Sequence, residues 1–329
     1  MVYLDNASTS FPKPECVYQA LDHFARNDLA NPGRAGHKMA LSAEHTLDDC
    51  RHRLNQFLKG MGPERFIFTL NCTDALNMAF KGFLNEGDHV ITSDLEHNSV
   101  SRPLRVMELA GKITLTRIAS SPDGFLDPKA IEQAITPKTR LVAITHASNV
   151  LGTIQPIGDI GAICKSRGVT FLVDGAQTAG VVPIDIAAQN IDLLACPGHK
   201  SLFGPTGTGF LYVAPTIQLR TWREGGTGGD SSTETQPTLM PYWLEGGTPN
   251  VLGVAGLNAG LKWVTQEGLQ SLHKREMEIA VRSGLHCSPY IHKAQGSFPD
   301  GLVRISPGAF NTSADIEKVV AALKEILSV

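Results

Sequence analysis

The segment VTFLVDGAQ (169–177) is followed, after a short connection, by DLLACPGHKSLFGPTGTGFLYVA (192–214). Residues 169–174 and 192–196 are apolar, β-branched runs, each followed at once by small and polar residues, which predicts two buried strands. Asp174 ends the first run and Lys200 follows the second. In parallel sheets ligands bind at the carboxyl ends of the strands, so we expect both side chains at one functional edge.

The same alternation extends over the first two thirds of the chain. Further runs that predict strands are 65–69, 89–93, 113–118, 140–145 and 209–214. The segments between them, such as 127–135 and 157–168, carry apolar residues at helical spacing. The sequence therefore predicts an α/β fold with a mostly parallel, seven-stranded sheet and helices on both faces.

The last third has a different character. A loop rich in Gly, Ser, Thr and Pro precedes two predicted helices, 251–264 and 267–280, and the chain closes with a helix over 313–327 that Ser313 is placed to cap. The predicted helix that ends at Ala280 runs directly into the strand-like segment that begins at Val281, with no turn residue between them. We expect a shortened segment at this junction.

Composition excludes several classes of protein. The chain has 329 residues, a net charge of −3 and no long basic run, which argues against binding to nucleic acid or anionic lipid. No apolar stretch is long enough to cross a bilayer and the start lacks a secretory signal, so we predict a cytoplasmic protein that does not enter a membrane. The six cysteines have neither disulfide-framework nor zinc-site spacing, and no metal site is expected.

Asp174 and Lys200 suit pyridoxal phosphate, which needs an acid at its ring nitrogen and a lysine to form a Schiff base. Its phosphate could bind at Cys72 and Thr73, where a helix is predicted to begin after strand 65–69. Each residue also has a plainer interpretation: a turn carboxylate, a solvated lysine, and a simple helix cap. The segment GHKS imitates part of a P-loop, but His199 stands where a glycine is required, which argues against a nucleotide site.

Ten segments together carry a resemblance to a known family: YLDNASTSFPKP, NPGRAGHKMA, CTDALN, LEHNSV, SNVLGT, VDGAQ, PGHKSLFGPTGTGFLYV, EGGTPN, VRSGLHC and VRISPGAFNT. In order and spacing they make the chain similar to class V pyridoxal-phosphate enzymes, specifically the cysteine desulfurases with a short, selenocysteine-lyase-like loop. The resemblance implies a fold-type I transferase with a small C-terminal α+β domain.

The resemblance implies a cofactor site made of Cys72, Thr73, His97, Asn149, Asp174, Gln177, His199, Lys200 and Thr227. Lys200 would bind the cofactor covalently and move the substrate α-proton, while Asp174 and Gln177 would contact the ring nitrogen and the ring hydroxyl. His97 would stack on the ring. Thr227 would reach the phosphate in the neighbouring subunit, which implies a homodimer.

For the substrate, the resemblance implies that Asn149 and Arg304 bind the amino-acid carboxylate and that Cys287 is the catalytic thiol. Cys287 would take sulfur from L-cysteine, or selenium from L-selenocysteine, and leave L-alanine. The persulfide would pass to an acceptor protein, for instance in iron–sulfur cluster assembly. His286 beside Cys287, in a turn of small residues, favours an exposed, reactive thiolate.

The implied domains are a large cofactor-binding domain over 15–261 and a small domain from 1–14 and 262–329, shortened near residues 280/281. Other functions stay open from the sequence alone. One is another class V activity, such as a selenocysteine lyase, an aminotransferase or a racemase. A second is a non-catalytic pyridoxal-phosphate-binding or scaffold protein. An NAD-dependent oxidoreductase is least favoured, since no GxGxxG follows the first strands.

Overall fold

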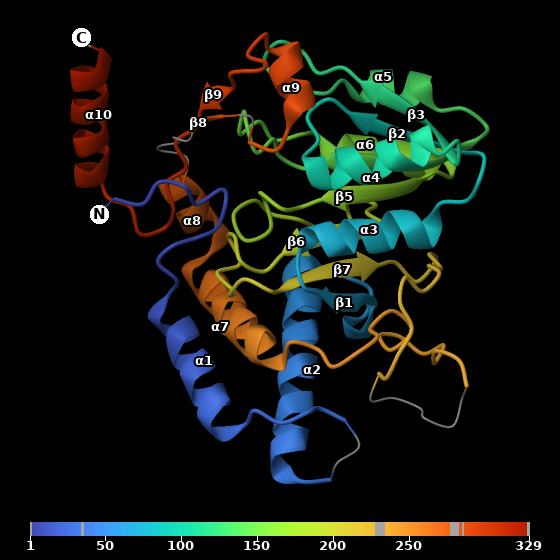
Figure 1. Cartoon of the computed structure of the whole chain (residues 1–329), viewed down its shortest axis with the longest axis vertical. Coiled ribbons are helices and arrows are strands. Elements are labelled where there is room, and N and C mark those ends of the chain that lie inside the picture. Colours follow the sequence, from blue (N-terminus) through green and yellow to red (C-terminus); the bar gives the residue numbers. More distant parts are fainter. Residues whose placement is uncertain (1, 34–35, 228–233, 277–282, 285, 328–329) are drawn as a thin grey trace.

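The computed structural model describes residues 2–33, 36–227, 234–276, 283–284 and 286–327 (Figure 1). Its centre is one seven-stranded sheet, and every strand of it falls on a run that the sequence predicts. The strands are β1 (Phe66–Thr69), β2 (Asp88–Ser93), β3 (Ile113–Ile118), β4 (Thr139–Thr145), β5 (Thr170–Asp174), β6 (Leu193–Pro197) and β7 (Gly209–Val213). The prediction of an α/β fold with this strand count is confirmed.

The strand order is β1-β7-β6-β5-β4-β2-β3. All neighbours pair in parallel except β7, which runs antiparallel to both β1 and β6. In the register, Asp174 on β5 stands between Thr145 on β4 and Ala195 on β6. Because these three strands are parallel, the loops that follow them open at the same edge. This register brings the Asp174 end of β5 beside the loops that carry Asn149 and Lys200.

Helices cover both faces of the sheet, as predicted. The helices before the last sheet strand are α1 (Glu15–Asn27), α2 (Lys38–Leu58), α3 (Cys72–Phe83), α4 (Asn98–Leu109), α5 (Pro128–Ala134) and α6 (Ile157–Arg167), with a 3₁₀ turn, η1 (Pro63–Arg65). The buried side chains of α3 and α4 form one apolar cluster with one face of the sheet. Those of α2, α5, α6 and α7 (Val251–Glu267) form a second cluster with the other face.

The C-terminal part contains α8 (Leu269–Glu276), β8 (Ser283–Gly284), α9 (Pro289–Ala294), β9 (Leu302–Val303) and α10 (Ser313–Leu327). The prediction that Ser313 caps the last helix is wrong: the helix already begins at Ser313, and the Asp315 N–H donates to the Thr312 hydroxyl (3.4 Å). The predicted junction at 280/281 lies outside the described residues, and the division into 15–261 and the flanking segments stays a prediction. None of residues 313–326 is buried, and α10 stands at one side of the molecule (Figure 1).

Within the described ranges, every helix is either too short or too polar to traverse a lipid bilayer. All six cysteines are described, and all are free thiols.

The second cluster contains a close approach between α6 and the loop before β6. A Cβ atom built on Gly161 would lie 1.9 Å from the backbone oxygen of Gln189, whereas one built on Gly158, one turn earlier, meets nothing within 4 Å. The loop therefore packs directly against the backbone of α6, and this contact helps to fix the spacing between helix and sheet.

The two glycines give a matched pair of variants. Gly161→Ala should lower the free energy of unfolding by about 1–3 kcal/mol, because backbone atoms must move apart. Gly158→Ala should raise it by about 0.5–1 kcal/mol through helix propensity. Urea unfolding followed by circular dichroism measures both. Equal effects of the two substitutions would contradict this packing.

Candidate active site

A cavity of about 260 Å³ lies at the carboxyl ends of β4, β5 and β6. Ten of the eleven residues that the sequence analysis singled out line it: Cys72, Thr73, His97, Asn149, Asp174, Gln177, His199, Lys200, Cys287 and Arg304. They come from α3, the start of α4, three strand ends and the C-terminal part, which are far apart in the sequence. The structure thus brings together nearly the whole predicted constellation.

Asp174 is the buried carboxylate of this cavity, with 2% of the residue exposed. Its Oδ1 accepts hydrogen bonds from the Ala176 N–H (2.9 Å) and the Cys72 thiol (3.5 Å). Burial and the Asp174 charge together raise the pKa of Cys72 well above its ordinary value, so this thiol stays protonated and donates. The carboxylate of Asp174 is therefore oriented by its own loop and by the first residue of α3.

Lys200 faces the same cavity from the turn after β6. Burial lowers its pKa, and the nearby carboxylate of Asp174 opposes this effect. Arg304 lowers the pKa further, whereas Cys287 raises it. A lysine with a lowered pKa has more of the neutral amine that attacks carbonyl carbons and accepts protons.

The N-terminus of α3 forms one wall of the cavity. The Asn71 side chain caps this helix by accepting from the Asp74 N–H (2.9 Å), while Cys72 and Thr73 occupy its first two positions. The first N–H groups of a helix have no partner within the helix, and its dipole favours an anion at this end. This wall therefore suits a phosphate group.

His97 is the N-cap residue of α4 and is half-buried. Its Nδ1 accepts from the Ser99 N–H (3.1 Å) and lies 2.8 Å from the Ser99 hydroxyl, which in turn lies 2.8 Å from the Thr73 hydroxyl. In the neutral ring these contacts place the proton on Nε2. Burial lowers the pKa of His97, since the opposing attraction of Asp174 is smaller, so the neutral ring dominates near pH 7.

The N-terminal segment, residues 3–13, binds the turn that carries Lys200. The backbone oxygen of His199 accepts from the Thr9 hydroxyl (3.1 Å) and the Lys13 amine (2.7 Å), and the backbone oxygen of Lys200 accepts from the Ser10 hydroxyl (2.9 Å). Burial, helped by the positive charges of Lys200 and Lys13, lowers the pKa of His199 to about 4. His199 is therefore neutral at physiological pH.

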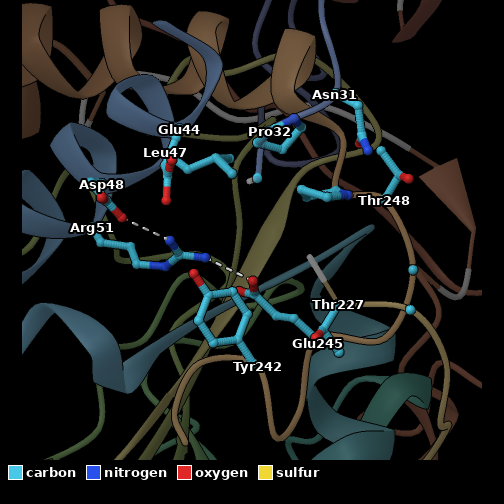
Figure 2. A pocket seen from close by; sticks show the side chains of 14 residues that line it. Asn31, Pro32, Glu44, Leu47, Asp48, Arg51, Thr227, Tyr242, Glu245 and Thr248 are labelled. Atoms are coloured by element: carbon cyan, nitrogen blue, oxygen red, sulfur yellow. Dashed lines mark hydrogen bonds and ion pairs between the residues drawn. The ribbon is translucent and has the colours of Figure 1, made fainter. Parts of the chain in front are cut away.

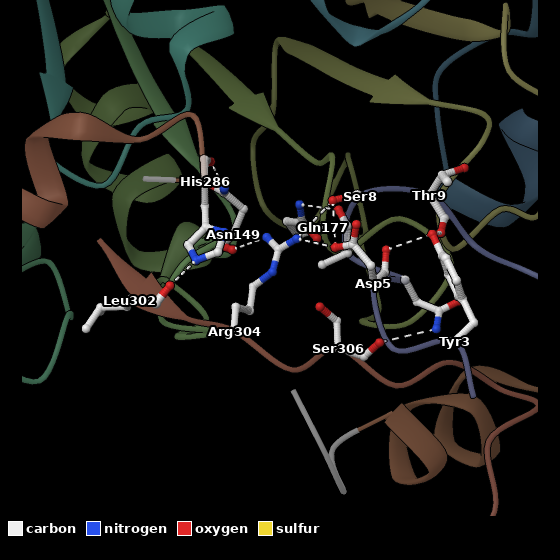
Figure 3. A network of polar contacts seen from close by, with 12 residues as sticks. Tyr3, Asp5, Ser8, Thr9, Asn149, Gln177, His286, Leu302, Arg304 and Ser306 are labelled. Atoms are coloured by element: carbon white, nitrogen blue, oxygen red, sulfur yellow. Dashed lines mark hydrogen bonds and ion pairs between the residues drawn. The ribbon is translucent and has the colours of Figure 1, made fainter. Parts of the chain in front are cut away.

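The same N-terminal segment holds Arg304 (Figure 3). One guanidinium nitrogen donates to Asp5 Oδ1 (3.1 Å) and to the Ser8 hydroxyl (3.0 Å), and another donates to the backbone oxygen of Asn149. Arg304 is 8% exposed and lines the cavity. A guanidinium fixed from three sides can present a permanent positive charge to a carboxylate in the cavity.

Cys287 is an exposed thiol at the rim of the cavity, whereas Cys50, Cys72, Cys164 and Cys196 are buried. His286 and Cys287 both adopt left-handed backbone conformations, with φ of 46° and 57°. The Cys287 backbone oxygen accepts from the Asn98 N–H at the start of α4 (2.7 Å). The turn thus lies against the helix that His97 caps.

Thr227 is the one predicted site residue that does not line this cavity; it lines another pocket, of about 210 Å³ (Figure 2). Arg51 also lines this pocket, where it donates to the largely buried Glu245 (2.7 Å) and to the exposed Asp48 (3.3 Å). Within this chain, Thr227 is therefore separate from the cavity of Lys200.

Sequence reasoning missed three contributors to the site. Ser99 connects His97 to Thr73, and Ser8 binds Arg304. Glu96, next to His97, is fully buried, and its Oε1 accepts from the Ser93 hydroxyl (2.7 Å) and the Thr145 N–H (3.0 Å). The signal in the sequence was the position of Glu96 directly before His97 in the segment LEHNSV (95–100).

The cavity fits pyridoxal phosphate. A buried carboxylate suits a protonated ring nitrogen, and Lys200 supplies an amine for the aldehyde. The start of α3 suits the phosphate. The backbone packs closely at Gly198 and Gly209, near the start of α3. A Cβ atom on Gly198 would lie 2.2 Å from the Thr208 hydroxyl, and one on Gly209 would lie 2.8 Å from the backbone carbonyl carbon of Asn71.

Comparison with known proteins agrees with this geometry. The sequence model of the family "Aminotransferase class-V" matches residues 2–278. A "Probable cysteine desulfurase" of Methanothermobacter thermautotrophicus is 31% identical over an alignment 381 positions long, which covers 99% of this chain and 94% of that protein.

Two solved structures extend the likeness to three dimensions. The apo structure of a cysteine desulfurase from Thermococcus onnurineus NA1 superposes with a TM-score of 0.93 at 27% identity, covering 99% of this chain and 94% of that one. A structure described as "SspA in complex with cysteine" is 31% identical, with a TM-score of 0.71 over 80% of this chain and 72% of that one.

Glu96 gives a testable pH effect. Burial raises its pKa to about 8, far above the value of an unfolded chain. Its stabilising contribution is therefore complete below about pH 4.5 and is lost as the pH rises through 8, by up to about 1.4 kcal/mol per pH unit. Glu96→Gln, which cannot ionise, should remove this slope. Urea unfolding between pH 5 and 9 measures it, and an unchanged slope in the variant would exclude a protonated Glu96.

Proposed function

This chain belongs to the aminotransferase class-V family and is a pyridoxal-phosphate-dependent cysteine desulfurase, and we propose that the cavity at β4, β5 and β6 is its active site. One observation carries the proposal: Asp174, Lys200, Arg304 and Cys287 line the same cavity. These residues supply an acid for a ring nitrogen, an amine, a carboxylate-binding guanidinium and a thiol.

When bound, the cofactor supplies an electron-withdrawing ring that makes the α-proton of the amino acid acidic. We propose that Cys72, Thr73 and His199 hold its phosphate and that Gln177 contacts its ring hydroxyl. Asp174 is placed to keep the ring nitrogen protonated, because its carboxylate is buried and fixed by the Ala176 N–H. His97, whose neutral ring caps α4, is placed to pack on the ring.

Lys200 moves the proton. Its lowered pKa favours the neutral amine, which takes the proton from the substrate α-carbon and afterwards returns a proton to the product. Arg304 binds the substrate carboxylate and so orients the α-carbon toward this amine, while Asn149, which bonds to Arg304 through its backbone oxygen, supports the same end of the substrate.

Cys287 takes the sulfur. Its thiolate attacks the sulfur of bound L-cysteine, so that a sulfur–sulfur bond forms and the bond between substrate sulfur and Cβ breaks. The electron pair left on Cβ takes up a proton. The products are L-alanine and a persulfide on Cys287, with the same atoms and electrons as L-cysteine and the thiol. The exposure of Cys287 at the cavity rim supports this role, because the persulfide must be passed on.

We further propose that the enzyme works as a homodimer that gives its sulfur to an acceptor protein for iron–sulfur clusters or other thio-cofactors. The position of Thr227, in a pocket away from Lys200, supports a contribution to the neighbouring subunit. The cytoplasmic location inferred from the sequence stays a prediction.

The central test uses Cys287→Ala and Lys200→Ala. With L-cysteine and a reductant, the wild-type protein should form sulfide and alanine in equal amounts. Cys287→Ala should lower this turnover by about 10³-fold or more but keep the yellow colour of the covalently bound cofactor, because the thiol acts only on substrate sulfur. Lys200→Ala should lose both. Full turnover of L-cysteine by Cys287→Ala would exclude the persulfide step.

The dimer is tested by complementation. Thr227→Ala should weaken binding of pyridoxal phosphate by about tenfold, the cost of one bond to a charged group. In mixed dimers with Lys200→Ala subunits, the subunit that retains Lys200 would receive an intact Thr227 from its partner. Cofactor titration of purified mixed dimers should therefore show one site per dimer with wild-type affinity. Weakened affinity at that site would place Thr227 in its own subunit's site.

A further inference from the structure

The turn formed by His286, Cys287 and Ser288, here called the thiol turn, holds an unfavourable backbone conformation. Two consecutive non-glycine residues, His286 and Cys287, are in the left-handed region, which few side chains other than glycine adopt without cost. Such a turn persists only where hydrogen bonds from neighbouring residues hold it on both sides. The side chain of Asn149 makes such bonds.

The Asn149 side chain binds both residues that flank Cys287. Its Nδ2 donates to the backbone oxygen of His286 (2.6 Å), and its Oδ1 accepts from the hydroxyl of Ser288 (2.7 Å). Ser288 is fully buried, so its hydroxyl depends on this bond for a partner of its own. One planar amide thus spans the thiol turn from one side of Cys287 to the other.

Two further bonds complete the support. The Asn98 N–H donates to the backbone oxygen of Cys287 (2.7 Å). The His286 ring nitrogen Nε2 lies 2.9 Å from the backbone oxygen of Leu302, on β9 (Figure 3). Asn149 is itself held, because Arg304 donates to its backbone oxygen. The residue that binds the substrate carboxylate and the residue that receives sulfur are therefore joined through Asn149.

We propose that Asn149 and Ser288 are positioning residues for the thiol of Cys287: they hold it at the distance and direction from which it attacks the sulfur of bound substrate. This inference rests on the proposed function and assigns to the Asn149 side chain a task beyond contact with the substrate. Each amide atom uses one hydrogen-bonding position for the turn, which leaves a second N–H and a second lone pair for the ligand.

The test compares two substrates. L-Cysteine needs the Cys287 thiol, whereas 3-chloro-L-alanine loses chloride by β-elimination after removal of the same α-proton and needs no thiol. Ser288→Ala should lower kcat for L-cysteine by about tenfold or more, since a misplacement of about 1 Å has large effects on rate. It should leave KM for L-cysteine, cofactor absorbance and chloride release from 3-chloro-L-alanine within about twofold. Parallel loss of both reactions, or loss of neither, would overturn the proposal.

The matched control is Ser101→Ala, which removes another buried serine hydroxyl, on α4, that contacts the Glu96 backbone oxygen (3.4 Å) and not the thiol turn. It should leave both reactions within about twofold of the wild type, because no contact of the turn is lost. A selective loss of L-cysteine turnover in this control would show that any nearby cavity has the same effect, and would also overturn the proposal.

A second readout needs no turnover, so it separates this proposal from the proposed function. The rate at which iodoacetamide alkylates Cys287 in the holoenzyme, followed by mass spectrometry, should rise about threefold in Asn149→Ala and in Ser288→Ala, because a released turn exposes the thiol further. The double variant should match Asn149→Ala, since the bond that Ser288→Ala removes is already broken there. Unchanged alkylation in all three variants would refute the positioning role even if L-cysteine is the substrate.

Discussion

The buried carboxylate of Asp174 is the constraint on which the rest of the site depends. A charge at the end of an apolar strand is costly unless hydrogen-bond donors face it, and here the Ala176 N–H and the Cys72 thiol donate to this carboxylate. The Ala176 loop and the Lys200 turn meet at this edge because β5 and β6 are parallel neighbours, and Cys72 reaches the carboxylate from the start of α3, which follows β1. The strand order that forms the sheet therefore also brings the groups of the active site together.

The N-terminal segment connects two parts of the site that the sheet alone does not join. Thr9, Ser10 and Lys13 bind the turn that carries Lys200, while Asp5 and Ser8 bind Arg304 (Figure 3). The same segment pairs with the chain beyond β9, where Asp5 and Ser306 form a parallel bridge. The N-terminal segment therefore joins the C-terminal part to the lysine turn by direct hydrogen bonds on both sides. This arrangement explains why the first residues of the chain belong to the active site.

Much of this could be predicted from the sequence, for identifiable reasons. Buried strands produce continuous β-branched runs, and the chemistry of Asp174 and Lys200 at two strand ends points to one cofactor. Hydrogen bonds between distant segments leave no such pattern: nothing in the sequence indicates that the Asn149 amide binds the turn of Cys287 or that Ser99 joins His97 to Thr73. The helix start at Ser313 was missed by one residue, because adjacent Thr312 and Ser313 are both good caps.

The basic groups of the cavity divide into two kinds, and this division has a mechanistic consequence. Burial lowers the pKa of Lys200, His97 and His199, which favours the neutral form of each of these bases. Arg304 cannot become neutral, because a guanidinium remains charged, and Asp5 balances part of its charge. The substrate carboxylate therefore binds to Arg304, whose charge is permanent. The amine of Lys200 can then move protons while the substrate stays bound. Had the two groups been exchanged, binding and proton transfer would compete for the same cation.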